Sequence, residues 1–376
     1  VGFEYKQNAA IYSPNHPGAF ESLLGLYRAG GVWVPLNARN AIKENCFILN
    51  HNDAEFLFYH SSFEENVQVI KNECPGIKNF VCLDKVVSDD PSLDDFIFNH
   101  HGEVEPYPDD PSDICGIFSS GGTTGQPKGI LWTNDVFETL VSEWMVHLPL
   151  KKPPVHLCAA PMTHAAGCVA LSMMGYGATN VIMNGVELPG LMEKIETYDV
   201  THLFLPPTAI YIMLAHPDVR NYDYSSLEYF IYAAAPMSVE KLREAIDVFG
   251  PVMTQTYGQA EAPMICTFFS PEDHIEALET NKVHRLSSCG QPSILTPVEI
   301  MDDDEKILPP GESGEIVVRG RLVMAGYYKN KEATEEVTTS NGWHRTGDIG
   351  HKDEDGYIYI VDRKKDMIIS GGFNIY

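Results

Sequence analysis

The chain has 376 residues, of which 44% are hydrophobic and 21% charged, so it can bury a sizeable core and form several subdomains. Its formal net charge of −26 argues against a nucleic-acid partner, because binding a phosphate backbone requires a basic surface. The eight cysteines stand singly, without a C-x-x-C pair, which favours reduced thiols in a cytoplasmic protein over a disulfide framework or a zinc site.

Helix and strand patterns alternate over the first third of the chain. Apolar residues at helical spacing, beginning at Phe20, end at Gly30 and Gly31, and a strand-like apolar run follows at 32–34. Two further helix-to-strand units are predicted before residue 83, and an acidic connection then leads to residue 112. This alternation is typical of the α/β class and predicts a first α/β subdomain over residues 1–112.

The segment 119–129 is rich in glycine and hydroxyl side chains and follows a predicted buried strand at 113–118. Glycines allow backbone N–H groups to converge on an anion, and Lys128 adds a positive charge for a phosphate. A Walker-type loop requires glycine before this lysine and serine or threonine after it, but Pro127 and Gly129 occupy these positions. The pattern therefore predicts a polyphosphate-binding loop of another kind.

The run from 157 to 186 contains no Asp, Glu, Lys or Arg. Pro161, His164 and several glycines divide it into shorter strand, loop and helix pieces, so we predict a buried core and no transmembrane segment. Strand and helix patterns continue to about residue 285, which predicts a second α/β subdomain over 113–285.

Short strand patterns separated by acidic turns replace the helices after Ser288. They predict a small β-rich subdomain over residues 286–362, followed by a terminal segment at 363–376.

Seven motifs together give the chain a family resemblance. They fall at 119–129, 161–167, 233–236, 256–261, 311–316, 345–348 and 362–374. In these motifs and their order the chain resembles the adenylate-forming enzymes, the superfamily of acyl- and aryl-CoA synthetases, luciferases and nonribosomal peptide adenylation domains. The resemblance implies two doubly wound α/β subdomains, a distorted β-barrel subdomain and a hinge at Lys365. It also implies a mobile C-terminal domain, which is absent from these 376 residues.

The activity implied by the resemblance is ATP-dependent activation of a carboxylic acid to acyl-AMP, with pyrophosphate release and then transfer to CoA. Glu261 is implied as the ligand of Mg²⁺, a hard cation that prefers oxygen donors. The departing phosphates are implied to contact Ser120, Gly122, Thr123, Thr124, Gly125 and Lys128. His164 is implied to position the acid near the α-phosphate, and it needs no general-base role because a carboxylate is already deprotonated.

The implied nucleotide site is built around Tyr257, whose ring offers a face to adenine, with Ala234 and Ala235 leaving room on the other side. Asp348 is implied to accept hydrogen bonds from the ribose hydroxyls, and Arg363 to reach the sugar or the α-phosphate. The motifs add Pro236, Thr256 and Gly258 to this site.

The substrate is expected to be a fatty or other hydrophobic acid, because the segment 163–174 contains no acidic residue to pair with an amino-acid ammonium group. The expected pocket residues are His164, Gly167, Tyr232, Ala233, Gly258 and Met264. Gly121 and Ala260 depart from the family pattern, each at a position where the family usually has a hydroxyl side chain. Two alternatives remain open: an acyl-AMP ligase that loads a carrier protein, and a noncatalytic nucleotide-binding protein, which the departures at Gly121 and Ala260 would fit.

Overall fold

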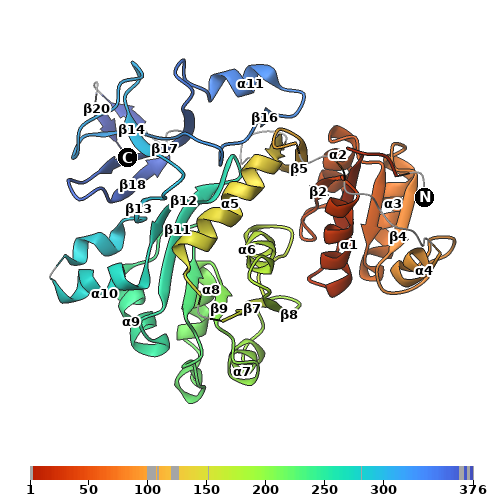
Figure 1. The fold of residues 1–376 in the computed structure, drawn as a ribbon, viewed down its shortest axis with the longest axis horizontal. Helices are drawn as coiled ribbons and strands as arrows, with labels where there is room; N and C mark the ends of the chain where they lie inside the picture. The colour runs from red at the N-terminus through yellow and green to blue at the C-terminus, as the bar shows by residue number, and fades with distance from the viewer. Residues whose placement is uncertain are drawn as a thin grey trace.

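The computed structural model describes residues 3–99, 107, 110–119, 127–150, 152–280, 282–363, 368–370 and 373–375. Within these residues it contains two seven-stranded sheets, a four-stranded antiparallel sheet and a two-stranded sheet. Helices accompany the two large sheets, and the small sheets follow them along the chain (Figure 1). The predicted α/β class with an additional β-rich part is confirmed.

The first large sheet has the strand order β16-β6-β5-β2-β1-β3-β4, with β1 to β5 parallel to one another. Its helix α1 starts where the His16 side chain accepts a hydrogen bond from the Gly18 N–H, and the chain turns after it at Gly30, whose φ is +69°. The strands are β1 (Asn8–Tyr12), β2 (Val32–Pro35), β3 (Phe56–Tyr59), β4 (Asn79–Cys82), β5 (Ile114–Ser119), β6 (Gly129–Thr133) and β16 (Gly326–Tyr327). The helices of this part are α1 (Pro17–Arg28), α2 (Ile42–His51), α3 (Glu64–Glu73) and α4 (Leu93–Phe98).

The membership of this sheet differs from the predicted subdomain boundary at residue 112. β5 pairs in parallel with β2 through Trp33 and Gly116, so the strand that leads into the phosphate loop belongs to the first sheet. The rings of Trp33 and Phe118 also meet edge to face, with centroids 5.2 Å apart. Long-range pairing therefore determines the sheet to which β5 belongs, and the local sequence pattern does not reveal this membership.

The second large sheet has the order β13-β12-β11-β10-β9-β7-β8, and its strands from β7 to β11 are parallel. Its strands are β7 (Val155–Cys158), β8 (Thr179–Ile182), β9 (His202–Phe204), β10 (Tyr229–Tyr232), β11 (Met253–Gln259), β12 (Ala262–Phe269) and β13 (Gln291–Pro292). Its helices are α5 (Asn134–His147), α6 (Ala165–Met174), α7 (Gly190–Thr197), α8 (Pro207–Leu214), α9 (Val239–Phe249) and α10 (Pro271–Glu279).

The uncharged run 157–186 forms part of β7, helix α6 and strand β8, and most of α6 is buried. No helix in the described part of the chain combines the length and the apolar character needed to cross a membrane.

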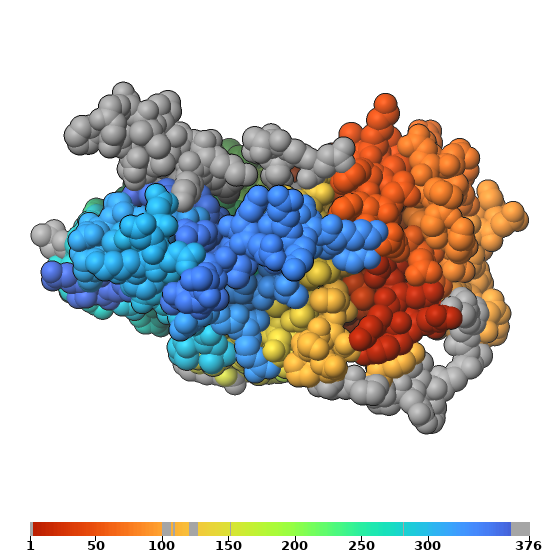
Figure 2. All heavy atoms as spheres, turned by 90° about the horizontal axis from the view of Figure 1, so that it is seen from above, coloured from red at the N-terminus to blue at the C-terminus, as the bar shows by residue number. Residues whose placement is uncertain are grey.

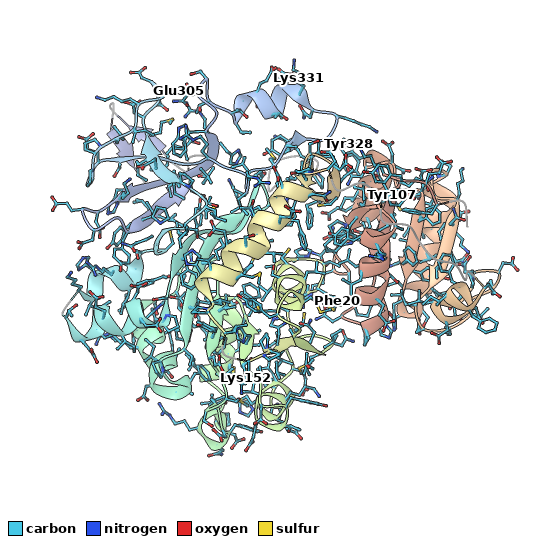
Figure 3. All side chains as sticks on the ribbon, in the orientation of Figure 1. Phe20, Tyr107, Lys152, Glu305, Tyr328 and Lys331 are labelled. Atoms are coloured by element: carbon cyan, nitrogen blue, oxygen red, sulfur yellow. The ribbon has the colours of Figure 1, made fainter. Side chains whose placement is uncertain are left out.

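The central hydrophobic core lies between the two large sheets. It joins Leu23 of α1, Trp144 of α5 and Val169 of α6 to side chains of both sheets. Phe20 extends from α1 into this core (Figure 3). Helices α2 and α3 cover the outer face of the first sheet, and α7 to α10 cover the outer face of the second. Both sheets are thus buried on two faces, as parallel sheets require.

The four-stranded sheet contains β14 (Val298–Met301), β15 (Ser313–Val318), β17 (His344–Lys352) and β18 (Ile358–Arg363). Short helix α11 (Lys331–Glu336) precedes β17, and β19 (Ile368–Ser370) pairs with β20 (Phe373–Ile375). The predicted start of this part at 286 differs from the structure, because β13 still pairs with β12 of the second sheet. Figure 2 shows the region of α11, in blue, against the first sheet, where Tyr328 donates a hydrogen bond of 2.7 Å to the Asp53 carboxylate.

Two buried histidines on neighbouring strands give the fold a pH dependence. His156 of β7 and His202 of β9 are register partners, and both are fully buried. Their Nδ1 atoms lie 2.9 Å from Asn180 Oδ1 and 2.8 Å from Thr201 Oγ1. Burial lowers the pKa of His156 to about 4 and that of His202 to about 3, so both rings are neutral in the folded protein at pH 7.

We expect the free energy of unfolding to fall as the pH drops below 6.5, the ordinary histidine pKa. Below this pH the two histidines are protonated in the unfolded chain but stay neutral in the folded protein. The free energy of unfolding therefore falls by about 1.4 kcal/mol per pH unit for each histidine until its folded pKa is reached. Urea unfolding at pH 7.5 and pH 5 measures this slope. His156→Asn with His202→Asn should make the slope shallower, and the buried His274 and His344, whose pKa values burial also lowers to about 4, account for part of what remains. His284→Asn at an exposed position should leave the slope as it is, and an unchanged slope in the double variant contradicts the assignment.

Candidate functional site

A cavity of about 290 Å³ lies between the two large sheets, near the carboxyl ends of their parallel strands. Open α/β sheets bind ligands at this end, because the loops that follow the strands diverge there. The end of β5, the loop after β2, the start of α6, the end of β10 and the β11–β12 turn all contribute to its wall. The cavity therefore collects residues from four of the seven motifs identified in the sequence.

One wall of the cavity is aromatic and apolar. The rings of Phe118 and Trp132 stack with centroids 3.7 Å apart, and Phe204, Cys168 and Met264 extend the surface. Burial raises the pKa of the Cys168 thiol to about 12, so this group stays neutral and acts as a small apolar side chain. Such a wall suits the hydrocarbon part of a ligand.

His164 stands at the start of α6 and lines the same cavity. Its Nδ1 lies 2.9 Å from Thr163 Oγ1, which orients the ring. Partial burial of the ring lowers the pKa of His164, and the nearby Arg39 charge lowers it further. The imidazole is therefore neutral at pH 7. Because Nδ1 is engaged by Thr163, Nε2 is the nitrogen that can donate a hydrogen bond to a bound anion, in the tautomer that carries its proton there.

The loop that carries His164 is fastened by a side chain of the first subdomain. The Asn15 amide donates hydrogen bonds to the carbonyls of Ala160 and Met183, at 2.8 and 2.9 Å. Asn15 Oδ1 accepts a hydrogen bond of 2.8 Å from the Met162 N–H. These bonds connect the loop after β1 to the loop before α6 and fix the position of His164.

Two of the expected pocket residues lie elsewhere. Tyr232 is fully buried in the outer core of the second sheet, the apolar layer between this sheet and helices α7 to α10. Its hydroxyl contacts Gln255 Oε1 at 3.1 Å and His274 Nε2 at 2.9 Å. Gly167 packs against the Met162 carbonyl and does not line the cavity. Side chains alternate along a strand, so Tyr232 faces away from the side shared by its neighbours Ile231 and Ala233.

The structure places Ala233, Ala234, Gly258 and Met264 along the cavity wall with His164. Ala234 adopts a φ of +74°, and the exposed residues after it are Ala235 and Pro236. Gly258 permits the close approach of β12, because a Cβ there would lie 2.5 Å from the Met264 backbone nitrogen.

Tyr257 and Asp348 meet beside this wall. The Tyr257 hydroxyl donates a hydrogen bond of 2.6 Å to Asp348 Oδ2, and burial together with this carboxylate raises the pKa of Tyr257. The backbone of Asp348 on β17 pairs with that of Arg363 on β18. Thr256 is 2% exposed, and its hydroxyl makes no hydrogen bond within the described residues. Motif residues from the second sheet and the four-stranded sheet thus come together.

Glu261 lies in the turn between β11 and β12, where its backbone carbonyl accepts a hydrogen bond of 2.8 Å from the Met324 N–H. Its Oε1 accepts a second bond of 2.8 Å from the Tyr327 hydroxyl, and the Lys128 ammonium lies 4.6 Å from the centre of the Tyr327 ring. Tyr327 was not among the residues predicted from the sequence. It is distant from every motif along the chain, so only its pairing with β6 reveals it.

The surroundings of Glu261 fit a Mg²⁺ ion that is held mainly by substrate phosphates. No cluster of three or more His, Cys, Asp or Glu side chains occurs in the part of the chain that the structure describes. Mg²⁺ commonly takes one or two protein carboxylates and completes its octahedron with phosphate oxygens and water. A single carboxylate near a lysine meets this requirement.

Several predicted residues fall outside the described part of the chain. They are the phosphate-loop residues Ser120, Gly122, Thr123, Thr124 and Gly125, and the hinge residue Lys365.

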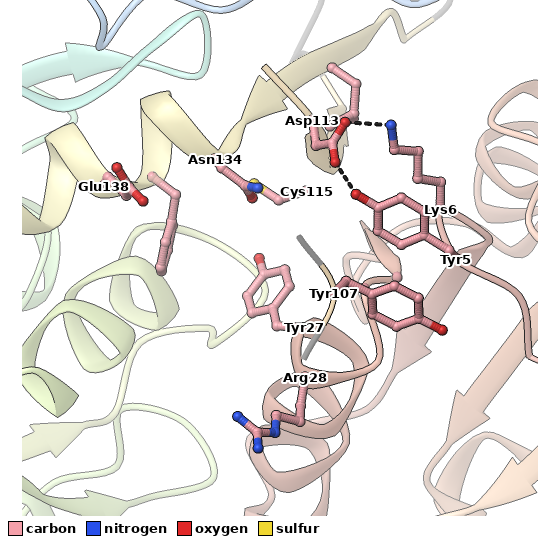
Figure 4. A pocket seen from close by; sticks show the side chains of 13 residues that line it. Tyr5, Lys6, Tyr27, Arg28, Tyr107, Asp113, Cys115, Asn134 and Glu138 are labelled. Carbon is pink, nitrogen blue, oxygen red and sulfur yellow. Dashed lines mark hydrogen bonds and ion pairs between the residues drawn. The ribbon is translucent and has the colours of Figure 1, made fainter. Parts of the chain in front are cut away.

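A second cavity, of about 370 Å³, is lined by α1, α5 and the start of β5 (Figure 4). Its Lys6 is engaged locally, because Asp113 forms an ion pair with this lysine and also accepts a hydrogen bond from Tyr5. The cavity contains Tyr27 and Glu138 but none of the motif residues. The first cavity is therefore the candidate active site.

A model of the AMP-binding enzyme family matches residues 1–328. The chain is 36% identical over 266 residues to the medium/long-chain-fatty-acid–CoA ligase FadD8 of Mycobacterium tuberculosis; this alignment covers 71% of the chain and 45% of the ligase, so it spans less than half of that relative. It is 32% identical over 386 residues to the feruloyl-CoA synthase of an Amycolatopsis species, covering 100% of the chain and 72% of the synthase.

Two solved structures share the fold over almost the whole chain. The amide bond synthetase McbA of Marinactinospora thermotolerans superposes with a TM-score of 0.88 and 27% identity, covering 100% of this chain and 73% of McbA. The o-succinylbenzoate CoA synthetase MenE of Bacillus subtilis, in complex with its acyl-adenylate intermediate, superposes with a TM-score of 0.84 and 26% identity, covering 99% of this chain and 71% of MenE.

Proposed function

Because the chain belongs to the AMP-binding enzyme family, with curated relatives that are acid–CoA ligases, we propose that its protein is an AMP-forming acid–CoA ligase. The observation that carries the proposal is the position of the apolar cavity. Its lining includes the aromatic residues Phe118, Trp132 and Phe204 together with His164, Ala234 and Gly258, of which Ala234 is expected to face the nucleotide. An acid bound in it would present its carboxylate at the junction with ATP.

The proposed reaction has two steps. A carboxylate oxygen attacks the α-phosphorus of ATP, the bond from this phosphorus to the bridging oxygen breaks, and pyrophosphate leaves. The thiolate sulfur of CoA then attacks the acyl carbon, its thiol proton passing to solvent, and AMP leaves as the C–O bond breaks. His164 positions the carboxylate in the first step, which requires no proton transfer.

Charge is the main obstacle to the first step, because both reactants are anions. Two like unit charges 4 Å apart repel by about 4 kcal/mol at an effective dielectric constant of 20. Lys128 would offset part of this repulsion. Mg²⁺ bound to the phosphates, with Glu261 as its protein ligand, would supply further positive charge.

We propose a hydrophobic acid, fatty or aryl, as the substrate. Phe118, Trp132 and Phe204 supply flat apolar contacts, and Cys168 and Met264 supply polarizable ones. The names of the two relatives, a fatty-acid ligase and a feruloyl-CoA synthase, agree with both kinds of acid.

The acceptor and the location are further parts of the proposal. CoA is proposed as the acceptor because the relatives are CoA ligases, with an acyl carrier protein as the alternative. A cytoplasmic location is supported by the eight cysteines, all of which are free and buried.

The decisive experiment is ATP-dependent pyrophosphate release by the full-length protein, with acetate, decanoate, palmitate and ferulate, each with and without CoA. Release together with acyl-CoA formation from decanoate, palmitate or ferulate would support the whole proposal. Release without a CoA thioester would reject CoA as acceptor and redirect the assay to a carrier protein or an amine. Binding of MgATP without pyrophosphate release from any acid, by wild type and Lys128→Ala alike, would favour the noncatalytic alternative.

A further inference from the structure

Strand β16 brings residues from late in the chain to the start of β6. Tyr327 is the register partner of Ile130, and the Tyr328 N–H donates a hydrogen bond of 2.7 Å to the Gly129 carbonyl. Lys128 directly precedes Gly129 in sequence. The backbone pairing therefore sets Tyr327 beside the lysine that closes the phosphate-loop motif.

The side chain of Tyr327 contacts two charged groups that the sequence motifs identify separately. Its hydroxyl donates a 2.8 Å hydrogen bond to Glu261 Oε1, and the Lys128 ammonium stands 4.6 Å from its ring centre. Tyr327 is only 9% exposed and Lys128 and Glu261 are half-buried, so water competes less with both contacts than it would on an open surface. One neutral side chain thus connects a carboxylate of the second sheet with a cation at the edge of the first.

The position of Tyr327 is fixed on each side. Gly326 before it has a φ of +143°, and a Cβ there would lie 2.9 Å from the Thr334 side chain. The Tyr327 N–H donates a hydrogen bond of 2.8 Å to Thr334 Oγ1. Met324, three residues before Tyr327, donates a backbone hydrogen bond to the Glu261 carbonyl. Burial and the Glu261 carboxylate raise the pKa of Tyr327, so its hydroxyl keeps the proton that it donates.

We propose that Tyr327 is a positioning residue of the adenylation site. Its hydroxyl holds the Glu261 carboxylate for the MgATP complex, and its ring holds the Lys128 ammonium beside the phosphates. Within the described residues, Glu261 Oε2 accepts no hydrogen bond, which leaves this oxygen for an ion or its water shell. The proposal rests on the proposed function, because it assigns roles toward MgATP.

The test separates the hydroxyl from the ring in the full-length protein. Tyr327→Phe removes only the hydroxyl, whereas Tyr327→Leu also removes the ring under Lys128. Calorimetry gives the dissociation constants of MgATP and of ATP in EDTA, independently of turnover. We expect Tyr327→Phe to weaken MgATP binding about tenfold and metal-free ATP binding less than twofold, because a lost hydrogen bond to a charged group has an effect of this order. Tyr327→Leu should weaken both.

Tyr328→Phe is the matched control, because it removes a tyrosine-to-carboxylate hydrogen bond of 2.7 Å at Asp53 on the surface. It should leave both dissociation constants unchanged. Glu261→Gln combined with Tyr327→Phe should bind MgATP no more weakly than Glu261→Gln alone, because without the carboxylate Tyr327 has no Mg²⁺ ligand left to position. Urea unfolding of each variant identifies any general loss of folding.

Two results would overturn the inference: wild-type MgATP affinity in folded Tyr327→Phe, or full additivity in the double variant. Failure of the wild-type protein to bind MgATP would instead count against the proposed function. The two failures are therefore distinguishable.

Discussion

Replacing Glu261 with glutamine is expected to lower kcat/KM for pyrophosphate release on the order of 100-fold, the size of effect seen when one transition-state contact is removed. The amide oxygen can still accept the Tyr327 hydrogen bond, so the turn between β11 and β12 should keep its shape. What is lost is the negative charge that would hold Mg²⁺ on the phosphates. The dependence of the rate on Mg²⁺ concentration should therefore shift to higher concentration.

Glu138→Gln provides the comparison for this experiment. Glu138 is an exposed carboxylate of α5 that lines the second cavity, and its change should leave pyrophosphate release within twofold of wild type. An equal loss of pyrophosphate release in both variants would show that the effect of Glu261→Gln does not arise from the proposed magnesium site. A Glu261→Gln enzyme with wild-type kinetics would remove Glu261 from the proposed magnesium site.

Replacing Gly167 with alanine is expected to destabilise the protein by about 3 kcal/mol or more, or to displace His164. The added Cβ would lie 1.8 Å from the Met162 carbonyl oxygen, and a backbone atom cannot rotate away as a side chain can. Met162 cannot shift easily either, because Asn15 accepts a hydrogen bond from its N–H. Urea unfolding and the KM for the acid measure the two possible responses.

Gly25→Ala is the matched substitution in helix α1, where a Cβ would have no neighbour within 4 Å. It should be neutral or stabilise the protein by up to about 1 kcal/mol, because alanine is the better helix former. A similar loss of unfolding free energy in both variants would mean that replacing any helical glycine destabilises the protein, and that the contact of Gly167 with Met162 is not the cause.

Much of the fold and of the site was predictable from local patterns. The family resemblance implied that His164, Tyr257 and Glu261 contact the substrates, and this stays a prediction, with His164 lining the cavity. Helix and strand periods predicted the α/β class, which the structure confirms. Such features depend on residues close together in the sequence, where steric and hydrogen-bonding preferences act directly.

Long-range pairing could not be predicted in this way. The assignment of β5 to the first sheet depends on Trp33 and Gly116, which are far apart in sequence. The role proposed for Tyr327 depends on the strand Gly326–Tyr327, which is too short to show a periodic pattern. Tyr232 is a different case, because simple alternation along β10 was sufficient to place it on the outer face.

The burial of all eight cysteines has a practical consequence for following motions of this protein. A thiol reagent can attack such a group only when the surrounding segment opens, so the labelling rate measures opening. Cys46 and Cys74 lie in the outer core of the first sheet, whereas Cys168 and Cys266 lie in the central core. Mass spectrometry of briefly labelled protein would therefore show which core opens first, without any introduced probe, and whether a ligand at the wall formed by Cys168 delays it.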